Sequence, residues 1–166
     1  MTAAYDPAFG SPIDGLPDIA AVLGPLLARV PREEQPLLIA LAERLAAERY
    51  RGWAHEVADA ARTAGLLACA EREEEIARRV EALYPNAPAA ERDLVARNPD
   101  LVAVNRSLFA GHSLDGQLRL QARGERLGAA TWRSLARAAD PAARETFLAC
   151  ALLEEESAAF LESILA

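Results

Sequence analysis

The sequence predicts an all-α protein whose long helices form a four-helix bundle. Residues 67–75 and 148–156 are a near-identical sequence repeat at an offset of 81 residues. Each copy has Leu-Ala-Cys-Ala, then two further residues and three glutamates. The match reaches back, with one single-residue gap, into the preceding predicted helix, so the repeating unit is a pair of helices. Heavy use of Ala, Leu, Glu and Arg and apolar residues spaced by three and four support the same fold class.

Size and charge exclude several functional classes. The 166 residues and 17.8 kDa suit one domain with a real core. A net charge of -7 argues against nucleic acid or an anionic membrane as the main partner. The chain has no lysine, which excludes Schiff-base chemistry. Its start lacks the features of a signal peptide and no apolar stretch suits a bilayer, so we expect a cytoplasmic protein.

Residues 1–30 are predicted to form an N-terminal extension with an accessory helix, and residues 31–166 to form the bundle. Turn-forming residues crowd the first sixteen positions. A short helix is expected from Pro17 to about Val30, because Pro17 and Asp18 suit a helix start and apolar residues follow on one side. We expect this helix to cover the bundle as a lid.

The first hairpin is predicted to begin after Pro31, with Glu33 and Glu34 in the first turn of its first helix. Glu43 lies on the apolar stripe of that helix. The second helix should start near Asp59, a good N-cap, and carry Glu73 on its stripe. The two stripes comprise Ile39, Ala42, Glu43, Ala46, Tyr50, Trp53 and Val57, and then Leu66, Cys69, Glu73, Ile76, Val80 and Leu83.

A connection of about thirty residues follows, too long for a tight turn, and should cross the bundle. It is expected to hold one short helix over Ala89 to Arg97. The third long helix should run from near Ser113 to about Ala138, with Leu120, Arg123 and Leu127 in its first half. Asp140 and Pro141 should open the fourth, whose inward stripe is Phe147, Cys150, Glu154, Ser157, Leu161 and Ile164.

One glutamate per long helix, Glu43, Glu73, Glu125 and Glu154, is therefore expected inside the bundle. Buried carboxylates need partners, metal ions or raised pKa values. Tyr50, Trp53 and Ala54 follow the first of the four glutamates, and Trp132 and Ala136 follow the third. On these residues and the four glutamates, the chain over about 43–164 resembles the ferritin-like superfamily, in particular its rubrerythrin-type branch. The resemblance implies a di-metal carboxylate site, a long crossover between duplicated hairpins and Fe or Mn as the metals.

The sequence departs from that family at two positions. Ile76 and Ser157 stand three residues after Glu73 and Glu154, where the family has histidine. The chain's two histidines, His55 and His112, are interpreted as surface or capping residues. Four carboxylates alone still suit hard cations such as Mn, Mg or Fe.

Two interpretations of function stay open. The favoured one is a ferritin-like protein whose carboxylate site is reduced or lost, acting as a binding or structural module and as a homodimer, with the carboxyl groups bonded to Tyr50, Trp132, Ser157 and water. The alternative is a non-haem Fe- or Mn-binding oxidoreductase that uses the four glutamates, with Tyr50 and Trp132 behind them. Whether the protein is an enzyme is left open, and no motif of nucleophilic hydrolases is present.

Two smaller features also carry alternatives. Residues 105–113 mix polar, aromatic and glycine residues, so they suit either a small-molecule or anion pocket or, as the favoured interpretation, a crossover loop that packs Leu108 and Phe109 onto the bundle. Cys69 and Cys150 are expected to be small core residues, with a contact between them left open.

Overall fold

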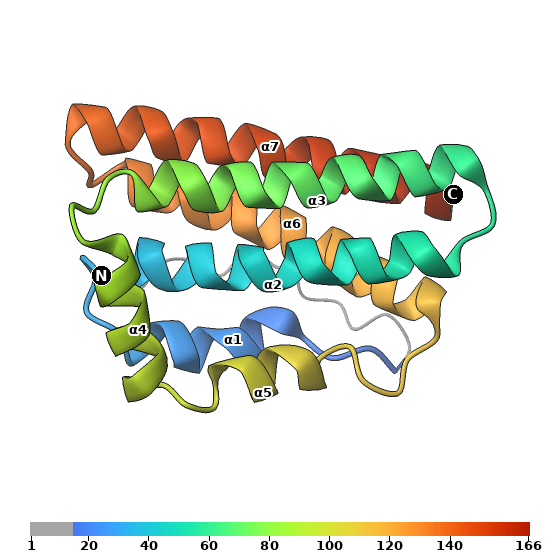
Figure 1. Ribbon diagram of the computed structural model, residues 1–166, viewed down its shortest axis with the longest axis horizontal. Helices are drawn as coiled ribbons and strands as arrows, with labels where there is room; N and C mark the ends of the chain where they lie inside the picture. The colour runs from blue at the N-terminus through green and yellow to red at the C-terminus, as the bar shows by residue number, and fades with distance from the viewer. Residues whose placement is uncertain (1–14) are drawn as a thin grey trace.

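The computed structural model describes residues 15–166, and within them every regular element is a helix (Figure 1). The predicted all-α class is therefore confirmed for this part of the chain. The helices are α1 (Ile19–Ala28), α2 (Gln35–Glu56), α3 (Ala60–Glu81), α4 (Ala87–Arg97), α5 (Leu101–Ser107), α6 (Leu114–Ala136) and α7 (Pro141–Leu165). The turns predicted for residues 1–14 lie outside the described residues.

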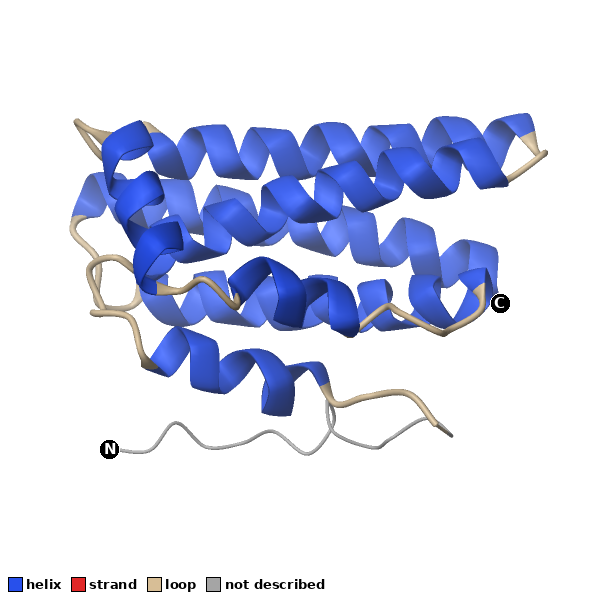
Figure 2. Cartoon of the chain, turned by 60° about the horizontal axis from the view of Figure 1, so that its bottom comes forward, coloured by secondary structure: helices blue, strands red, loops and turns tan. Residues whose placement is uncertain are grey.

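Four long helices, α2, α3, α6 and α7, lie alongside one another (Figure 1). Extensive contacts join α2 to α3 and α6 to α7, and α3 packs against α7. The connection between the two pairs contains α4, which packs on α2 across one end, and α5, which runs beside α1 (Figure 2). Helix α1 also contacts α6, so it covers the side of the molecule where α2 and α6 face each other.

Four predicted helix starts are confirmed by their side-chain caps. Asp18, Asp59, Ser113 and Asp140 each stand just before a helix and accept a hydrogen bond from a backbone N–H of its first turn. Such caps satisfy backbone donors that have no partner inside the helix. The local sequence therefore determines where α1, α3, α6 and α7 begin.

Two details of the prediction were wrong. Helix α2 starts at Gln35, with Glu34 as its N-cap, so Glu33 and Glu34 are not in its first turn. The connection holds a second helix, α5, whose N-cap Asp100 makes no capping bond, so no local signal marked it.

Along the four long helices the core has two apolar layers with the glutamates between them, and a third apolar cluster joins α1, α4 and α5 to the start of α2. One layer contains Tyr50, Trp53, Leu66, Cys69, Leu120 and Leu161. The other contains Ala40, Ile76, Val80, Trp132, Phe147 and Cys150. Both cysteines are buried free thiols, as expected of core residues. Within residues 15–166, no helix has the length and apolar character needed to span a membrane.

Candidate metal centre

Four glutamates from four different helices are withdrawn from solvent in the middle of the molecule. Relative exposure is 9% for Glu43, 0% for Glu73, 1% for Glu125 and 2% for Glu154. These are the four glutamates that were predicted to face inward because each lies on the apolar stripe of its helix. Burial of four carboxyl groups in one region is expensive unless something neutralises them.

Three of these carboxyl groups converge. One oxygen each from Glu43, Glu73 and Glu154 can be chosen so that all three atoms lie within 4.8 Å of one another. Glu125 does not belong to that set of three. Its Oε1 instead accepts two hydrogen bonds of 2.7 Å, from the Tyr50 hydroxyl and from Nε2 of Gln121.

Neutral donors bind two of the other three carboxyl groups. The indole Nε1 of Trp132 donates to Oε1 of Glu154 at 2.8 Å, and the Ser157 hydroxyl donates to Oε1 of Glu73 at 3.2 Å. Tyr50, Trp132 and Ser157, the three residues expected behind the carboxylates, thus each contact one of them. Because these donors carry no charge, they orient the carboxyl groups without neutralising them.

Glu154 also depends on a glycine of the neighbouring helix. A Cβ built on Gly128 of α6 would stand 2.4 Å from Oε1 of Glu154 and 2.6 Å from its carboxyl carbon. Only a residue without a side chain therefore leaves room for this carboxyl group beside α6. The position was missed from the sequence, where Gly128 lies three residues after Glu125 without another signal.

A buried cation was also missed. Arg49 of α2 donates from Nη2 to Oε1 of Gln121 at 3.2 Å, and Gln121 in turn donates to Glu125. Arg49 reaches the carboxyl groups only through this amide. Its place six residues after Glu43 gave no sign of the link, because Gln121 comes from a helix far along the chain.

Burial and mutual repulsion raise the pKa values of Glu43, Glu73 and Glu154 and so favour their protonated forms. Burial, then the charge of Glu125, raises the pKa of Glu43 to about 8. The pKa values of Glu73 and Glu154 are raised well above the usual range, first by burial and then by neighbouring carboxylates. Burial lowers the pKa of Arg49 to about 10, although nearby carboxylates oppose that shift.

Two buried oxygens of these four glutamates have no hydrogen-bond partner among the described residues. Oε2 of Glu73 and Oε2 of Glu125 are shielded from solvent and accept no hydrogen bond from the described chain. Buried polar atoms in folded proteins are nearly always paired. Carboxylate oxygens in this state are the ligands that hard divalent cations prefer.

The two halves of the repeat differ at the imidazole positions. Ile76 is fully buried in the apolar layer beyond Glu73, while Ser157 is bonded to Glu73. His55 is exposed and His112 is half-buried beside the start of α6, in agreement with their interpretation as surface or capping residues. All the converging donors are therefore oxygens.

Comparison of this chain with protein-family models, with curated proteins and with solved structures finds no match.

Proposed function

We propose that the protein is a ferritin-like module whose di-metal carboxylate site is reduced to an all-oxygen site that holds a hard divalent cation. Glu43, Glu73 and Glu154 would supply the first ligands, and Glu125 would turn its free oxygen toward the same region. Mn²⁺ and Fe²⁺ are the cations that suit such a donor set in this fold.

The observation that carries the proposal is the pair of unpartnered oxygens, Oε2 of Glu73 and Oε2 of Glu125. Each belongs to a carboxyl group whose other oxygen is already fixed by a donor. Because this hydrogen bond already fixes the side chain, binding a cation at the second oxygen costs no further side-chain conformational entropy. Binding of a dication would also remove the repulsion that raises the pKa values of Glu43, Glu73 and Glu154.

The chain's own residues would orient ligands and exclude water. Tyr50 and Gln121 hold Glu125, Trp132 holds Glu154, and Ser157 holds Glu73. When bound, Fe or Mn would supply one-electron redox chemistry, whereas Mg²⁺ would supply only charge. Without imidazole ligands we expect weaker binding than in a histidine-containing site.

The ferritin-like assignment is supported by the arrangement of the helices. The α2–α3 and α6–α7 pairs carry the repeated sequence, and α4 and α5 lie in the long connection between them. We propose that they form a duplicated four-helix bundle with a crossover, covered by α1. Glutamates at matching places in the two pairs support a common origin for the hairpins.

The competing function is a metal-free binding or structural module. It is favoured by Ile76 and by the four donors, which already satisfy Oε1 of Glu73, Glu125 and Glu154. In that case the raised pKa values of Glu43, Glu73 and Glu154 favour their protonated forms near neutral pH. The two functions therefore differ in one measurable property, the affinity for divalent metal.

Metal content separates the two functions. Protein from cells grown with added iron and manganese should carry metal in stoichiometric amount, and Glu73→Gln and Glu154→Gln should each lose at least nine-tenths of it. Glu71→Gln and Glu156→Gln are matched controls, because both residues are exposed on the same two helices. Metal-free wild-type protein would favour the metal-free module. Equal metal in all five proteins would place the metal outside the four glutamates and contradict the proposed site.

The predicted homodimer and cytoplasmic location stay predictions. A dimer is supported by Leu67, Leu148 and Leu152, which are exposed on α3 and α7, two helices that pack together. Sedimentation velocity at micromolar concentration tests it, with Leu148→Glu and Leu152→Glu expected to yield monomers.

A further inference from the structure

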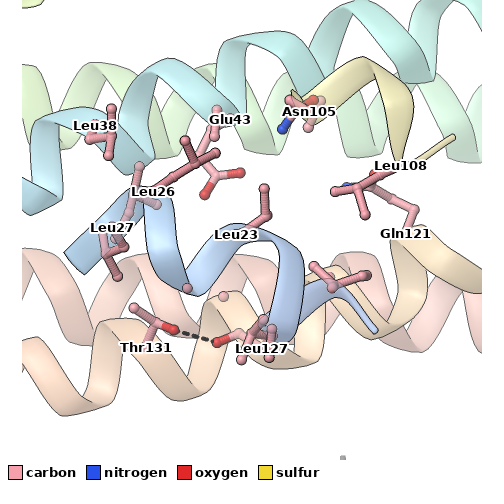
Figure 3. Close-up of a pocket in the computed structure, with 18 of the residues that line it drawn as sticks. Leu23, Leu26, Leu27, Leu38, Glu43, Asn105, Leu108, Gln121, Leu127 and Thr131 are labelled. Atoms are coloured by element: carbon pink, nitrogen blue, oxygen red, sulfur yellow. Dashed lines mark hydrogen bonds between the residues drawn. The ribbon is translucent and has the colours of Figure 1, made fainter. Parts of the chain in front are cut away.

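A pocket of about 230 Å³ lies beside the candidate metal centre (Figure 3). Helices α1, α2, α5 and α6 provide most of its wall, and Glu43 and Glu154 belong to the lining. Most of the lining is apolar, including Leu23, Leu26, Leu38, Leu108 and Leu127. The pocket therefore joins a leucine-rich space to two of the buried carboxyl groups.

Its size and lining suit a small aliphatic molecule. A dry, apolar cavity of about 150 Å³ takes up benzene, so a pocket of 230 Å³ has room for roughly nine non-hydrogen atoms. Leucine side chains offer no hydrogen bonds, so this part of the pocket favours hydrocarbon over a sugar or nucleotide.

One end of the pocket is polar. Asn105 and Gln121 lie at this end, away from Leu26, Leu27 and Leu38 (Figure 3). Arg49 joins them, donating from Nη1 to Oδ1 of Asn105 at 2.6 Å and stacking over the Phe109 ring at 4.1 Å. Both interpretations of residues 105–113 bear on this pocket, the favoured one because Leu108 and Phe109 pack into the apolar core and the alternative one because Asn105 lines the pocket.

The polar end of the pocket contains hydrogen-bond donors that have no acceptor among the described residues. Among the described residues Arg49 makes no ion pair, and its Nε is buried without a partner. Asn105 is 3% exposed, and within residues 15–166 its amide nitrogen donates no hydrogen bond. A guanidinium and an amide N–H side by side recognise a carboxylate through charge-assisted hydrogen bonds.

We propose that the pocket binds a short-chain aliphatic monocarboxylate, with its carboxylate at Arg49 and Asn105 and its chain along the leucines toward Glu43. The volume sets the chain at about seven carbons plus the two oxygens. This inference goes beyond the metal site, because Arg49 lacks a carboxylate partner whether protons or cations neutralise the four glutamates.

Binding of saturated acids from butanoate to dodecanoate to the full, chelator-treated chain tests the proposal. Affinity should rise about fourfold with each added methylene and stop rising at about seven to eight carbons, where the pocket is full. Isothermal titration calorimetry reports the series on the wild-type protein alone. Absence of saturable octanoate binding at millimolar concentration, or affinity that keeps rising to dodecanoate, would overturn the inference.

Two pairs of variants test the two ends of the pocket. Arg49→Gln should weaken octanoate binding at least tenfold and leave octan-1-ol unchanged, whereas Arg51→Gln, on the exposed face of the same helix, should change neither. Ala42→Leu narrows the pocket and should weaken both ligands tenfold, while Ala159→Leu, exposed on α7, should not. Circular dichroism confirms that each variant is folded.

A final comparison separates this pocket from the metal site. Octanoate affinity should be the same within twofold with and without Mn²⁺. Octanoate binding that requires Mn²⁺ and is insensitive to Arg49→Gln would mean that the acid coordinates the metal, which overturns the inference and leaves the proposed metal site intact. Normal octanoate binding by a protein that does not bind Mn²⁺ would overturn the proposed metal site and leave the carboxylate pocket intact.

Discussion

The carboxyl group of Glu154 occupies the space that a side chain at Gly128 would need. A Cβ at position 128 would approach Oε1 of Glu154 to 2.4 Å, and both oxygens and the carboxyl carbon lie within 2.7 Å. The Trp132 indole, one turn further along α6, donates a hydrogen bond to Oε1 of Glu154. Two residues of α6 therefore determine where the carboxyl group of Glu154 lies.

Gly128→Ala should displace Glu154 and lower Mn²⁺ affinity at least tenfold, which corresponds to about 1.4 kcal/mol. Gly124→Ala is the matched control, because it lies one turn away on α6 and its Cβ would meet only Ile19 at an ordinary 3.7 Å. Calorimetric titration with Mn²⁺ measures both. Equal affinity in the two variants would show that Glu154 takes no part in binding.

The metal-free protein should lose stability as pH rises from about 4.5 to about 8. Glu43 has a folded-state pKa of about 8 against an ordinary 4.5, so the folded state retains a proton that the unfolded state releases. Its contribution is complete below the unfolded pKa and is lost as pH passes through the folded pKa, with a slope of up to about 1.4 kcal/mol per pH unit.

Urea unfolding of chelator-treated protein between pH 5 and pH 8 checks this slope. Glu43→Gln, which has no proton to lose at this position, should make the profile less steep by up to about 1.4 kcal/mol per pH unit, while Glu73 and Glu154 keep part of the slope. Glu71→Gln on the exposed face of α3 should leave the profile unchanged. Saturating Mn²⁺ should reverse the trend, because the metal binds the ionised carboxylates. A wild-type profile that is flat over this range would contradict the raised pKa values.

Tyr50→Phe should destabilise the protein by about 1–3 kcal/mol, because it removes one of the two donors that Oε1 of Glu125 receives in a buried site. Tyr84→Phe is the control, since its hydroxyl donates to the Glu33 backbone oxygen in an exposed location and should cost less than about 1 kcal/mol. Urea unfolding at pH 7 measures both, and a smaller cost at Tyr50 than at Tyr84 would argue against the buried hydrogen bond.

Two glycine substitutions should act in opposite directions. Gly65→Ala should cost about 1–3 kcal/mol, because a Cβ there would press into the Phe160 ring of α7. Gly52→Ala should stabilise the protein by up to about 1 kcal/mol, since this position inside α2 has open space and the substitution improves helix propensity. Thermal unfolding shows whether each substitution raises or lowers the stability of the protein. A stabilising Gly65→Ala would contradict the close packing of α3 on α7.

The sequence allowed prediction of the helices and of the inward glutamates because both depend on local patterns. Caps and apolar stripes lie within one helix, and the repeat places the same residue types at matching positions. Helix α5 lacks a side-chain cap and was missed. The polar link from Arg49 through Gln121 to Glu125 joins distant helices, so no local pattern marks it.

The two halves of the repeat also differ in a way that their similar sequences did not predict. Tyr50 and Trp132 occupy matching positions, yet Tyr50 donates across to Glu125 of the other hairpin while Trp132 donates to Glu154 within its own. A hydroxyl and an indole N–H extend to different lengths from the helix. As a result three carboxyl groups converge and Glu125 stands beside them, an arrangement that a symmetrical duplication does not predict.

The most direct test of the carboxylate site is calorimetric titration of chelator-treated protein with Mn²⁺ at pH 7 in two buffers of different ionisation enthalpy. The proposed site predicts saturable binding with proton release, seen as a buffer-dependent heat, because the cation displaces protons from Glu43, Glu73 and Glu154. Glu73→Gln should lose the binding and Glu71→Gln should keep it. Absence of saturable Mn²⁺ binding to the wild-type protein, or unchanged binding in Glu73→Gln, would contradict the proposed metal site.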